Sequence, residues 1–445
     1  MIGNPMRTRA SILVGLLWCL ALLSLVVISV LHTARLDLIV QKNYGDRIQA
    51  HYLALAGIEK AKALLYNDLR DRQRGRKNHT GDLYNDPDDF RSVKFGPGEF
   101  TVFRPPQENE NGNVIYGIGD EESRLNVNYA GAEELAKLPG MAPEIVAAIM
   151  DWRDEDNNVS PGGAEAEYYT SLRPAYLPRN GLIQTTRELL MVRGISSQLL
   201  LGDGEDFPEL ESEGETSPAS GNPGNADRGW NEFLTVNGWT VNVNAAGDDR
   251  VNVQNADEKT LSGVSGISQD IARAIVAYRG QKQLESLADL LDVTAPQNQQ
   301  GATRTGNQNQ GQPSGPTVIS EDLFMEIADD VCVDSTREQA GAVNINTAGA
   351  QVLTCLPGMT PELAQAVVSY RRSIGFFPNI AWLLKTPGMN RDIFKQLVGR
   401  ITARSETFRI ISEGKVTSSG ARQRIMAVVQ ISKDELQMLS YREDL

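Results

Sequence analysis

The segment from Ile12 to Leu31 contains twenty consecutive residues without a charge, reading ILVGLLWCLALLSLVVISVL. A helix over this segment is about 30 Å long, which matches the hydrocarbon thickness of a bilayer. Because Arg7 and Arg9 precede it, we expect the short leader to stay in the cytoplasm and the rest to lie outside. A cleaved secretory signal is the alternative, but its apolar region is normally shorter and ends at a small-x-small site, which this sequence lacks. The pattern therefore predicts a retained membrane helix.

The same helix is predicted to continue beyond the membrane. No proline occurs between Pro5 and Pro87, and residues 36–65 are rich in Ala, Leu, Glu, Lys and Arg. Apolar residues, mostly three or four positions apart, trace one helical face: Tyr44, Ile48, Tyr52, Leu55, Ile58 and Leu65. We predict one helix from about residue 11 to 66, whose second half packs on a domain outside the membrane.

Composition excludes several classes of function. A length of 445 residues suggests about three domains. The net charge of −14 has the wrong sign for a chain whose main work is to neutralise phosphates. Three cysteines and three histidines exclude a disulfide-dense domain, a four-cysteine zinc site and most histidine-based catalysis. Gly-x-Ser-x-Gly, His-Glu-x-x-His and phosphate-loop motifs are also missing, so we expect no enzymatic activity.

A membrane helix that runs directly into a packed helix, behind a short basic leader, resembles the pilin and pseudopilin family. The resemblance implies cleavage by a prepilin peptidase between Ala10 and Ser11, although the family usually carries Gly where this chain has Ala10. The fifth mature residue would be Gly15, where most members carry Glu. The minor pseudopilin K of type II secretion commonly lacks that Glu, so this difference points to one subfamily.

Three segments of the chain share one pattern with fixed spacing. Each begins Asn-x-Asn or Asn-x-Gln, continues to a Pro-Gly or Ser-Gly pair, and ends in Trp-Arg or Tyr-Arg. The first Asn, the Gly and the final Arg are Asn126, Gly140 and Arg153; Asn252, Gly266 and Arg279; and Asn344, Gly358 and Arg371. This arrangement predicts helix-hairpin-helix units in which the polar residues cap a helix and Gly makes the turn. A Leu-Leu pair downstream of each copy indicates a second, degenerate hairpin that closes the unit.

Helix-hairpin-helix units commonly bind DNA, so a membrane-anchored DNA receptor outside the cytoplasm is the alternative function. DNA binders usually carry a second Gly and then Lys or Arg after the hairpin. This chain instead places Glu144, Asp270 and Glu362 four residues after the three hairpin glycines. Because these carboxylates would repel phosphate, we expect a structural or protein-facing role and no nucleic-acid partner.

The loop after the first repeat is strongly acidic. Asp151, Asp154, Asp156 and Asn157 are followed by a Gly-Gly turn and by Glu165. Such hard oxygen ligands at close range suit Ca²⁺ better than a transition metal, although the spacing is not that of an EF-hand. A solvated acidic loop without a metal is the alternative reading.

This loop and the segments after it resemble the helical domain of minor pseudopilin K, whose members hold calcium there. The similarity lies in Asp-Trp-x-Asp-x-Asp from Asp151, Gly-Ala-Glu-x-x-Tyr-Tyr from Gly163 and Arg187-Glu-Leu-Leu-Met-Val-Arg-Gly. Asp120-Glu-Glu-Ser-Arg-Leu-Asn-Val-Asn and Leu439-Ser-Tyr-Arg are similar to the family's junction and carboxyl end. The resemblance implies a tip subunit of the periplasmic pseudopilus, anchored in the bacterial inner membrane. Its implied partners are I-like and J-like minor pseudopilins, the major pseudopilin and the prepilin peptidase.

We therefore expect an α+β pseudopilin fold, with a long amino-terminal membrane helix, a small antiparallel sheet and a large inserted helical domain. Strands are predicted at 100–103, 114–118, 407–411 and 424–431. The expected order is a leader (1–10), the two halves of the helix (11–31, 32–70), sheet (71–123), first unit (124–201), acidic linker (202–249), second unit (250–293), low-complexity insertion (294–318), third unit (319–405) and final strands (406–445). Cys332 and Cys355 are candidates for a disulfide outside the membrane.

Overall fold

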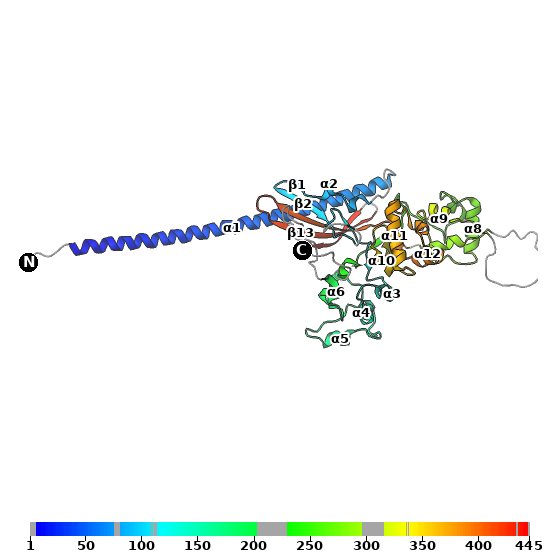
Figure 1. Ribbon diagram of the computed structural model, residues 1–445, viewed down its shortest axis with the longest axis horizontal. Helices are drawn as coiled ribbons and strands as arrows, with labels where there is room; N and C mark the ends of the chain where they lie inside the picture. Colours follow the sequence, from blue (N-terminus) through cyan, green and yellow to red (C-terminus); the bar gives the residue numbers. More distant parts are fainter. Residues whose placement is uncertain are drawn as a thin grey trace, which may run out of the picture.

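The computed structural model describes residues 6–74, 81–107, 110, 114–202, 229–295, 316–334, 336, 338–432 and 435–443. Half of the predicted leader (1–5), residues 203–228 of the acidic linker and residues 296–315 of the low-complexity insertion lie outside these ranges. Figure 1 shows a long helix that carries an α+β head at its carboxyl end, with helical lobes on the far side of the sheet.

Helix α1 runs without interruption from Met6 to Gln73, which confirms one continuous helix and extends it beyond the predicted limits. Among the described residues it is the one helix long and apolar enough to cross a membrane. Between Ile12 and Val40 every large apolar side chain is at least 47 % exposed. This half of α1 therefore projects from the head, and no other described part of the chain packs against it, as Figure 1 shows.

The second half of α1 packs on the sheet, and the predicted apolar face is only partly buried. Tyr44 and Tyr52 are more than 60 % exposed, whereas Ala50, Ala54 and Ala61 are fully buried. Small side chains let the helix backbone approach the sheet closely. A Cβ atom at Gly414 would lie 2.1 Å from the carbonyl oxygen of Ala50. Ile58 and Leu65 of the predicted face are buried in this contact, but the pattern of large apolar residues did not include the alanines that share it.

The sheet under α1 is antiparallel, with strand order β1-β2-β12-β13-β14 and β3 paired to β12. Its strands are β1 (Val93–Phe95), β2 (Gly98–Phe103), β3 (Gly119–Asp120), β12 (Thr407–Val416), β13 (Arg422–Ser432) and β14 (Glu435–Arg442). The expectations at 100–103, 407–411 and 424–431 are confirmed. At 114–118 the chain forms only an isolated bridge between Arg104 and Ile115, and β14 was not predicted. The short elements η1 (Asp82–Tyr84) and α2 (Pro87–Phe90) cover one end of the sheet core.

The helical domain interrupts the sheet between β3 and β12, and it consists of three units. A short parallel ladder closes each unit: β4 (Leu125–Asn126) with β5 (Leu234–Thr235), β7 (Val251–Asn252) with β8 (Val331–Cys332), and β10 (Val343–Asn344) with β11 (Ile401–Thr402). Strands β6 (Trp239–Val241) and β9 (Glu338–Ala340) form an antiparallel pair between units. The inserted α+β architecture expected from the sequence is thus confirmed.

Each unit contains short helices, including 3-10 helices labelled η. The first unit has α3 (Ala132–Leu135), α4 (Pro143–Arg153), α5 (Ala166–Ser171), η2 (Thr186–Met191), α6 (Ser197–Leu201) and η4 (Trp230–Glu232). The second has α7 (Glu258–Leu261), α8 (Gln269–Arg279), η5 (Leu287–Asp292) and α9 (Glu321–Ile327). The third has α10 (Ala350–Cys355), α11 (Pro361–Ile374), η6 (Ile380–Lys385) and α12 (Arg391–Leu397).

These ladders place the unit boundaries differently from the sequence pattern. Helix α9 and strand β8 belong to the second unit, because β8 pairs with β7, whereas they were assigned to the third. Strand β5 belongs to the first unit, because it pairs with β4, whereas it was assigned to the linker. The sequence pattern marks where each unit begins, but the closing strand has no comparable motif.

A hydrogen bond from the final Arg of each repeat accounts for the fixed spacing within the three copies of the pattern. Its guanidinium donates to the main-chain carbonyl between the two polar residues that begin the repeat. The pairs are Arg153 with Val127, Arg279 with Val253 at 2.7 Å, and Arg371 with Ile345 at 2.8 Å. We call this contact the arginine clasp. It holds the end of the second helix against the start of the unit.

The Asn-x-Asn stretches do not cap helices, and that prediction is wrong. The residues that precede α3, α7 and α10 are Gly131, Asp257 and Gly349. Each first Asn instead accepts the N–H of the residue two positions later, while the second polar residue reaches forward along the chain. Asn346, for example, donates to the carbonyl of Phe377 and accepts its N–H. The polar pair therefore joins the two halves of a unit.

The proposed disulfide between Cys332 and Cys355 is also wrong, since both cysteines are free. Cys332 lies in β8 of the second unit, and Cys355 ends helix α10 of the third unit. Each thiol lies against a main-chain carbonyl of its own unit, Arg250 for Cys332 and Gln351 for Cys355. Sequence separation suggested proximity, but the unit boundary falls between the two residues.

Candidate metal centre and domain junction

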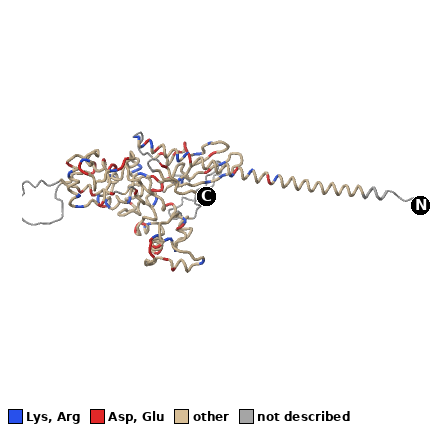
Figure 2. The backbone as a smooth tube through the Cα atoms, turned by 180° about the vertical axis from the view of Figure 1, so that it is seen from behind, with Lys and Arg blue, Asp and Glu red and all other residues tan. Residues whose placement is uncertain are grey.

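Three carboxylates of the acidic loop converge at the carboxyl end of α4. Asp151 lies in the last turn of α4, Asp154 directly follows that helix, and Glu165 precedes α5. One ligand atom from each lies within 4.8 Å of the others. Asp151 is fully buried and Glu165 is only 2 % exposed. Figure 2 shows acidic residues gathered at the tip of this lobe.

Several oxygens of this cluster have no partner. Both carboxylate oxygens of Glu165 and Oδ1 of Asp154 are buried without a hydrogen bond among the described residues. Burial, and then the charge of Asp156, raises the pKa of Asp154. Burial, and then the charges of Asp154 and Asp151, raises the pKa of Glu165. Unpartnered anionic oxygens at close range are costly, and a hard divalent cation would relieve that cost.

Gly163 is required by the position of Asp151. A Cβ atom at residue 163 would lie 2.0 Å from Oδ2 of Asp151, closer than any real contact. The N–H of Ser160 donates to the same carboxylate, at 3.3 Å to Oδ1 and 3.2 Å to Oδ2. The Gly-Gly turn thus wraps around Asp151 and orients it within the cluster.

The other two predicted ligands lie at the surface. Asp156 and Asn157 are exposed, and Asp156 accepts the N–H of Asn158 through its own side chain. The sequence reasoning missed Asn180, which donates to the carbonyl of Asp156 at 2.7 Å and to Oδ1 of Asn157 at 3.1 Å. Asn180 has a positive φ of 48° and a buried Oδ1 without a partner. An Asn-Gly pair at a turn was the available signal for it.

Three successive carboxylates join the sheet to the helical domain. Asp120 accepts from Asn344 at 3.0 Å, from Ser405 at 2.7 Å and from Thr347. Burial raises the pKa of Asp120. Burial, and then the charge of Asp120, raises the pKa of Glu122 well above its usual range. This junction lies in the motif that resembled the family's own junction, and it connects β3 to the third unit.

The middle carboxylate of the junction behaves differently. Burial acts to raise the pKa of Glu121, but the charges of Arg409 and Arg124 outweigh it and lower that pKa. The separations to the two guanidinium groups are 2.5 Å and 3.1 Å. Glu121 also accepts from the hydroxyl of Thr235, which closes the first unit. Glu121 is therefore ionised and ties the first unit to the sheet.

The hairpin glycines face other helices of their own units. Gly140, Gly266 and Gly358 have positive φ values of 69°, 86° and 70°, as the predicted turns require. A Cβ at Gly266 would contact Leu323 and Ile327 of α9. A Cβ at Gly358 would contact Gln396 and Ile393 of α12, and one at Gly140 would contact Leu199 of α6. The hairpins therefore hold the two halves of each unit together.

The fold and site define a class of protein. A membrane-length helix packs its second half on an antiparallel sheet, and helix-hairpin-helix units are inserted between the strands of that sheet. This arrangement agrees with the α+β fold that the resemblance to pseudopilins implied. The apolar first half of α1 is long enough to cross a membrane.

Comparison with known proteins finds matches to parts of this chain. Residues 122–201 match the family model "Type II secretion system (T2SS), protein K". Residues 247–295 and 338–402 match the model of the helix-hairpin-helix motif. Type II secretion system protein K of Klebsiella pneumoniae is 32 % identical over 161 residues, which are 35 % of this chain and 48 % of that protein. The chain thus covers about half of that relative. These matches confirm the resemblance to the protein K family.

Other matches are partial. Endonuclease/exonuclease/phosphatase family domain-containing protein 1 of Bos taurus is 31 % identical over 166 residues, covering 35 % of this chain and 28 % of that protein. A crystal structure of the GspK-GspI-GspJ complex from enterotoxigenic Escherichia coli overlaps 93 % of this chain and 99 % of that chain, at 13 % identity and a TM-score of 0.39. With a TM-score this low, we draw no conclusion about this chain from that structure.

Proposed function

We propose that this chain is a minor pseudopilin of a type II secretion system, the K-like subunit at the tip of the periplasmic pseudopilus. The observation that carries the proposal is the division of α1. Its first half is exposed on every side, while its second half packs on the chain's own sheet. An apolar rod without its own covering is suited to storage in a bilayer and to packing against the helices of neighbouring subunits.

The head supports a position at the tip. The second and third units lie beyond the end of the sheet that faces away from the projecting half of α1, and the first unit lies to one side of the sheet (Figure 1). A head of this size would obstruct another subunit stacked above it. In this proposal the amino terminus is cytoplasmic and the bulk is periplasmic. The partners are I-like and J-like minor pseudopilins and the major pseudopilin, and a prepilin peptidase matures the chain. The role is structural and not enzymatic.

Site-specific photo-crosslinking in cells that assemble the fibre tests this function. A crosslinker at Tyr44, which is 68 % exposed on α1, is expected to capture other pseudopilins. The matched control is Leu53, which lies on the same helix but is 3 % exposed and packs against Val416. It should crosslink only within the chain. A Tyr44 crosslinker that captures no pseudopilin, in cells that export their substrates normally, would contradict the proposal.

The alternative, a membrane-anchored DNA receptor, has less support. The hairpin glycines pack on neighbouring helices, and the acidic residues Glu144, Asp270 and Glu362 are exposed beside them. Carboxylates at these positions repel a phosphate backbone. Tight, salt-sensitive binding of duplex DNA by the full chain would overturn our preference.

We also propose that Asp151, Asp154 and Glu165 hold Ca²⁺. The donor set fits, because it supplies hard anionic oxygens that include buried atoms without partners. When bound, the ion would neutralise the repulsion among the three carboxylates and fix the loop between α4 and α5. The expected effect is structural stabilisation of the first unit, since a ligand that binds only the folded state adds to its stability.

Terbium luminescence and thermal unfolding of the full chain in detergent test the calcium site. Trp152 and Tyr169 are buried beside the cluster and are suitable sensitisers. Glu165→Gln is expected to weaken binding at least tenfold. Glu167→Gln, an exposed change on α5 outside the cluster, should leave binding unchanged. A Tm that chelator does not change, together with equal terbium signals from the two variants, would show that no site exists.

A further inference from the structure

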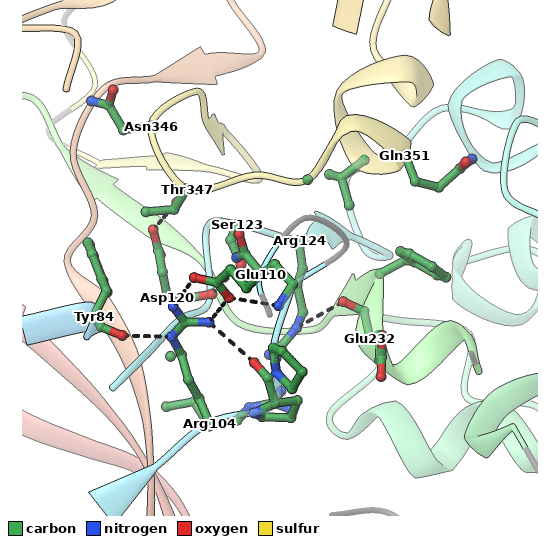
Figure 3. Close-up of a pocket in the computed structure, with 18 of the residues that line it drawn as sticks. Tyr84, Arg104, Glu110, Asp120, Ser123, Arg124, Glu232, Asn346, Thr347 and Gln351 are labelled. Atoms are coloured by element: carbon green, nitrogen blue, oxygen red, sulfur yellow. Dashed lines mark hydrogen bonds and ion pairs between the residues drawn. The ribbon is translucent and has the colours of Figure 1, made fainter. Parts of the chain in front are cut away.

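A cavity of about 360 Å³ lies where the sheet, the first unit and the third unit meet. Figure 3 shows Arg104, Glu110, Asp120 and Arg124 close together there, with Asn346 and Gln351 of the third unit farther out. This volume falls within the usual range of small-molecule sites, about 300–1,000 Å³. Nothing in the pseudopilus role described above uses this cavity.

The walls of the cavity carry an excess of positive charge. Five guanidinium groups line it, against three carboxylates from Glu110, Asp120 and Glu232. The guanidinium groups belong to Arg104, Arg124, Arg371, Arg372 and Arg409. Arg104 is neutralised by Glu110, which accepts two hydrogen bonds of 2.6 Å from it. Arg124 and Arg409 share the single carboxylate of Glu121.

Arg371 is the guanidinium best placed to receive a ligand. Its one hydrogen bond within the described part of the chain is the arginine clasp to Ile345, which uses one terminal nitrogen. No carboxylate of the described residues lies within ion-pair distance of it. Burial, and then the charge of Arg372, lowers the pKa of Arg371 to about 10, so the group remains charged at neutral pH. The charge of Glu110 acts against this shift, but both oxygens of Glu110 accept hydrogen bonds from Arg104. A further anion beside Arg371 would therefore offset the cost of desolvating its charge.

The remaining walls would suit the body of an organic anion. Phe376, Val352, Pro105 and Ile411 supply apolar surface. Gln351 and Asn231 supply neutral amide groups. A purely inorganic anion would leave this apolar surface unused, whereas a carboxylate on a short aliphatic stem would contact both kinds of wall. Arginine is suited to a carboxylate because its planar group can donate two parallel hydrogen bonds.

We propose that this cavity binds a carboxylate carried on a short apolar stem, with Arg371 and Arg372 facing the carboxylate and Phe376 and Val352 contacting the stem. The carboxylate has two sources, a free short-chain acid or the carboxyl terminus of a peptide. Occupancy would join the third unit to the sheet through the ligand, because Arg371 belongs to α11 and Ile411 to β12.

Isothermal titration of the full chain in detergent tests the proposal with four probes: 4-methylpentanoate, N-acetyl-Leu-Ala with a free carboxylate, the same dipeptide as its amide, and inorganic phosphate. At least one carboxylate is expected to bind ten or more times tighter than the amide and than phosphate. The tighter of the two carboxylates identifies the source. Equal binding of acid and amide, or no binding of either acid, would overturn the proposal.

The repeat supplies a matched control variant. Arg371→Gln removes both the clasp and the cavity charge, whereas Arg279→Gln removes the corresponding clasp of the second unit, which does not line the cavity. Arg371→Gln should weaken carboxylate binding at least tenfold, and Arg279→Gln should not change it. Arg372→Gln alters an exposed cavity residue and is expected to weaken binding without unfolding the chain. If all three variants bind the carboxylate with the same affinity as one another, Arg371 and Arg372 are not the residues that bind it.

Discussion

The guanidinium of Arg279 donates a hydrogen bond of 2.7 Å to the carbonyl oxygen of Val253, twenty-six residues earlier in the chain. The same clasp recurs in the other two units. We predict that Arg279→Ala destabilises the second unit by about 1.5–3 kcal/mol, because a charge-assisted hydrogen bond is lost and a buried carbonyl is left unpaired. Hydrogen exchange of amides in α7 and α8 would measure this. Arg273→Ala, on the same helix but 56 % exposed, is the control and should change little.

Gly163→Ala is expected to disrupt the acidic cluster. The added Cβ would lie 2.0 Å from Oδ2 of Asp151, so either the loop or the carboxylate has to move. We predict loss of terbium luminescence and a lower Tm of the calcium-loaded chain. Gly181→Ala, in the same lobe but with no atom nearer than 4.0 Å, should keep both properties. Wild-type luminescence in Gly163→Ala would mean that the position of Asp151 does not matter for binding.

Glu406 should make stability depend on pH near neutrality. Burial raises its pKa from 4.5 to about 7, against the lowering effect of the hydrogen bond from the N–H of Val241. A carboxyl group whose folded pKa is raised binds protons more tightly in the folded state. The free-energy cost of ionising Glu406 in the folded protein is therefore greatest above pH 7, and it decreases as the pH falls toward 4.5. The penalty at pH 8 is about 3 kcal/mol.

Unfolding midpoints of the full chain between pH 8 and pH 5 would measure this effect. We expect the wild type to become more stable as the pH falls through 7, and Glu406→Gln to be more stable than the wild type at pH 8. Glu435→Gln, an exposed change on β14, serves as the control and should follow the wild-type profile. Identical profiles for wild type and Glu406→Gln would show that this group ionises normally in the folded state.

Maturation of the amino terminus is predicted to begin the chain at Ser11. Replacing Ala10 with Trp should block cleavage, because the resemblance implies a small residue before the cut. Thr8→Ala changes the leader away from that position and should leave cleavage intact. Amino-terminal sequencing of the membrane form decides the matter, and a native chain that retains Met1 or Met6 would refute the prediction.

All three cysteines should carry free thiols. Alkylation under denaturing conditions without reductant is expected to add three labels, measured by intact mass. In the folded chain Cys355 should react slowly, since burial raises the pKa of its thiol to about 12 and only the thiolate reacts. Cys332→Ser is the control for the label count and should take up two labels. Cys355→Ser is less suitable, because Cys355 is fully buried. A chain that takes up only one label would restore the disulfide hypothesis.

Features with a local physical cause could be predicted from the sequence. The length and composition of α1 follow from residues close together in the chain, and so do the hairpin turns at Gly140, Gly266 and Gly358. The acidic loop was recognisable because Asp151, Asp154 and Glu165 lie within fifteen residues of one another. The spacing to each final Arg was also visible in the sequence, but the hydrogen bond that this Arg forms was not.

The tertiary structure decided everything that depends on contacts between distant segments. It brings one oxygen each of Asp151, Asp154 and Glu165 within 4.8 Å of one another, while Asp156 and Asn157 are exposed. It assigned α9 to the second unit through the pairing of β7 with β8, and it kept Cys332 apart from Cys355. It also formed the arginine-lined cavity from parts of the chain that have no pattern in common. The spacing of apolar residues indicates which face of a helix or strand is apolar, but long-range packing determines which residues that face contacts.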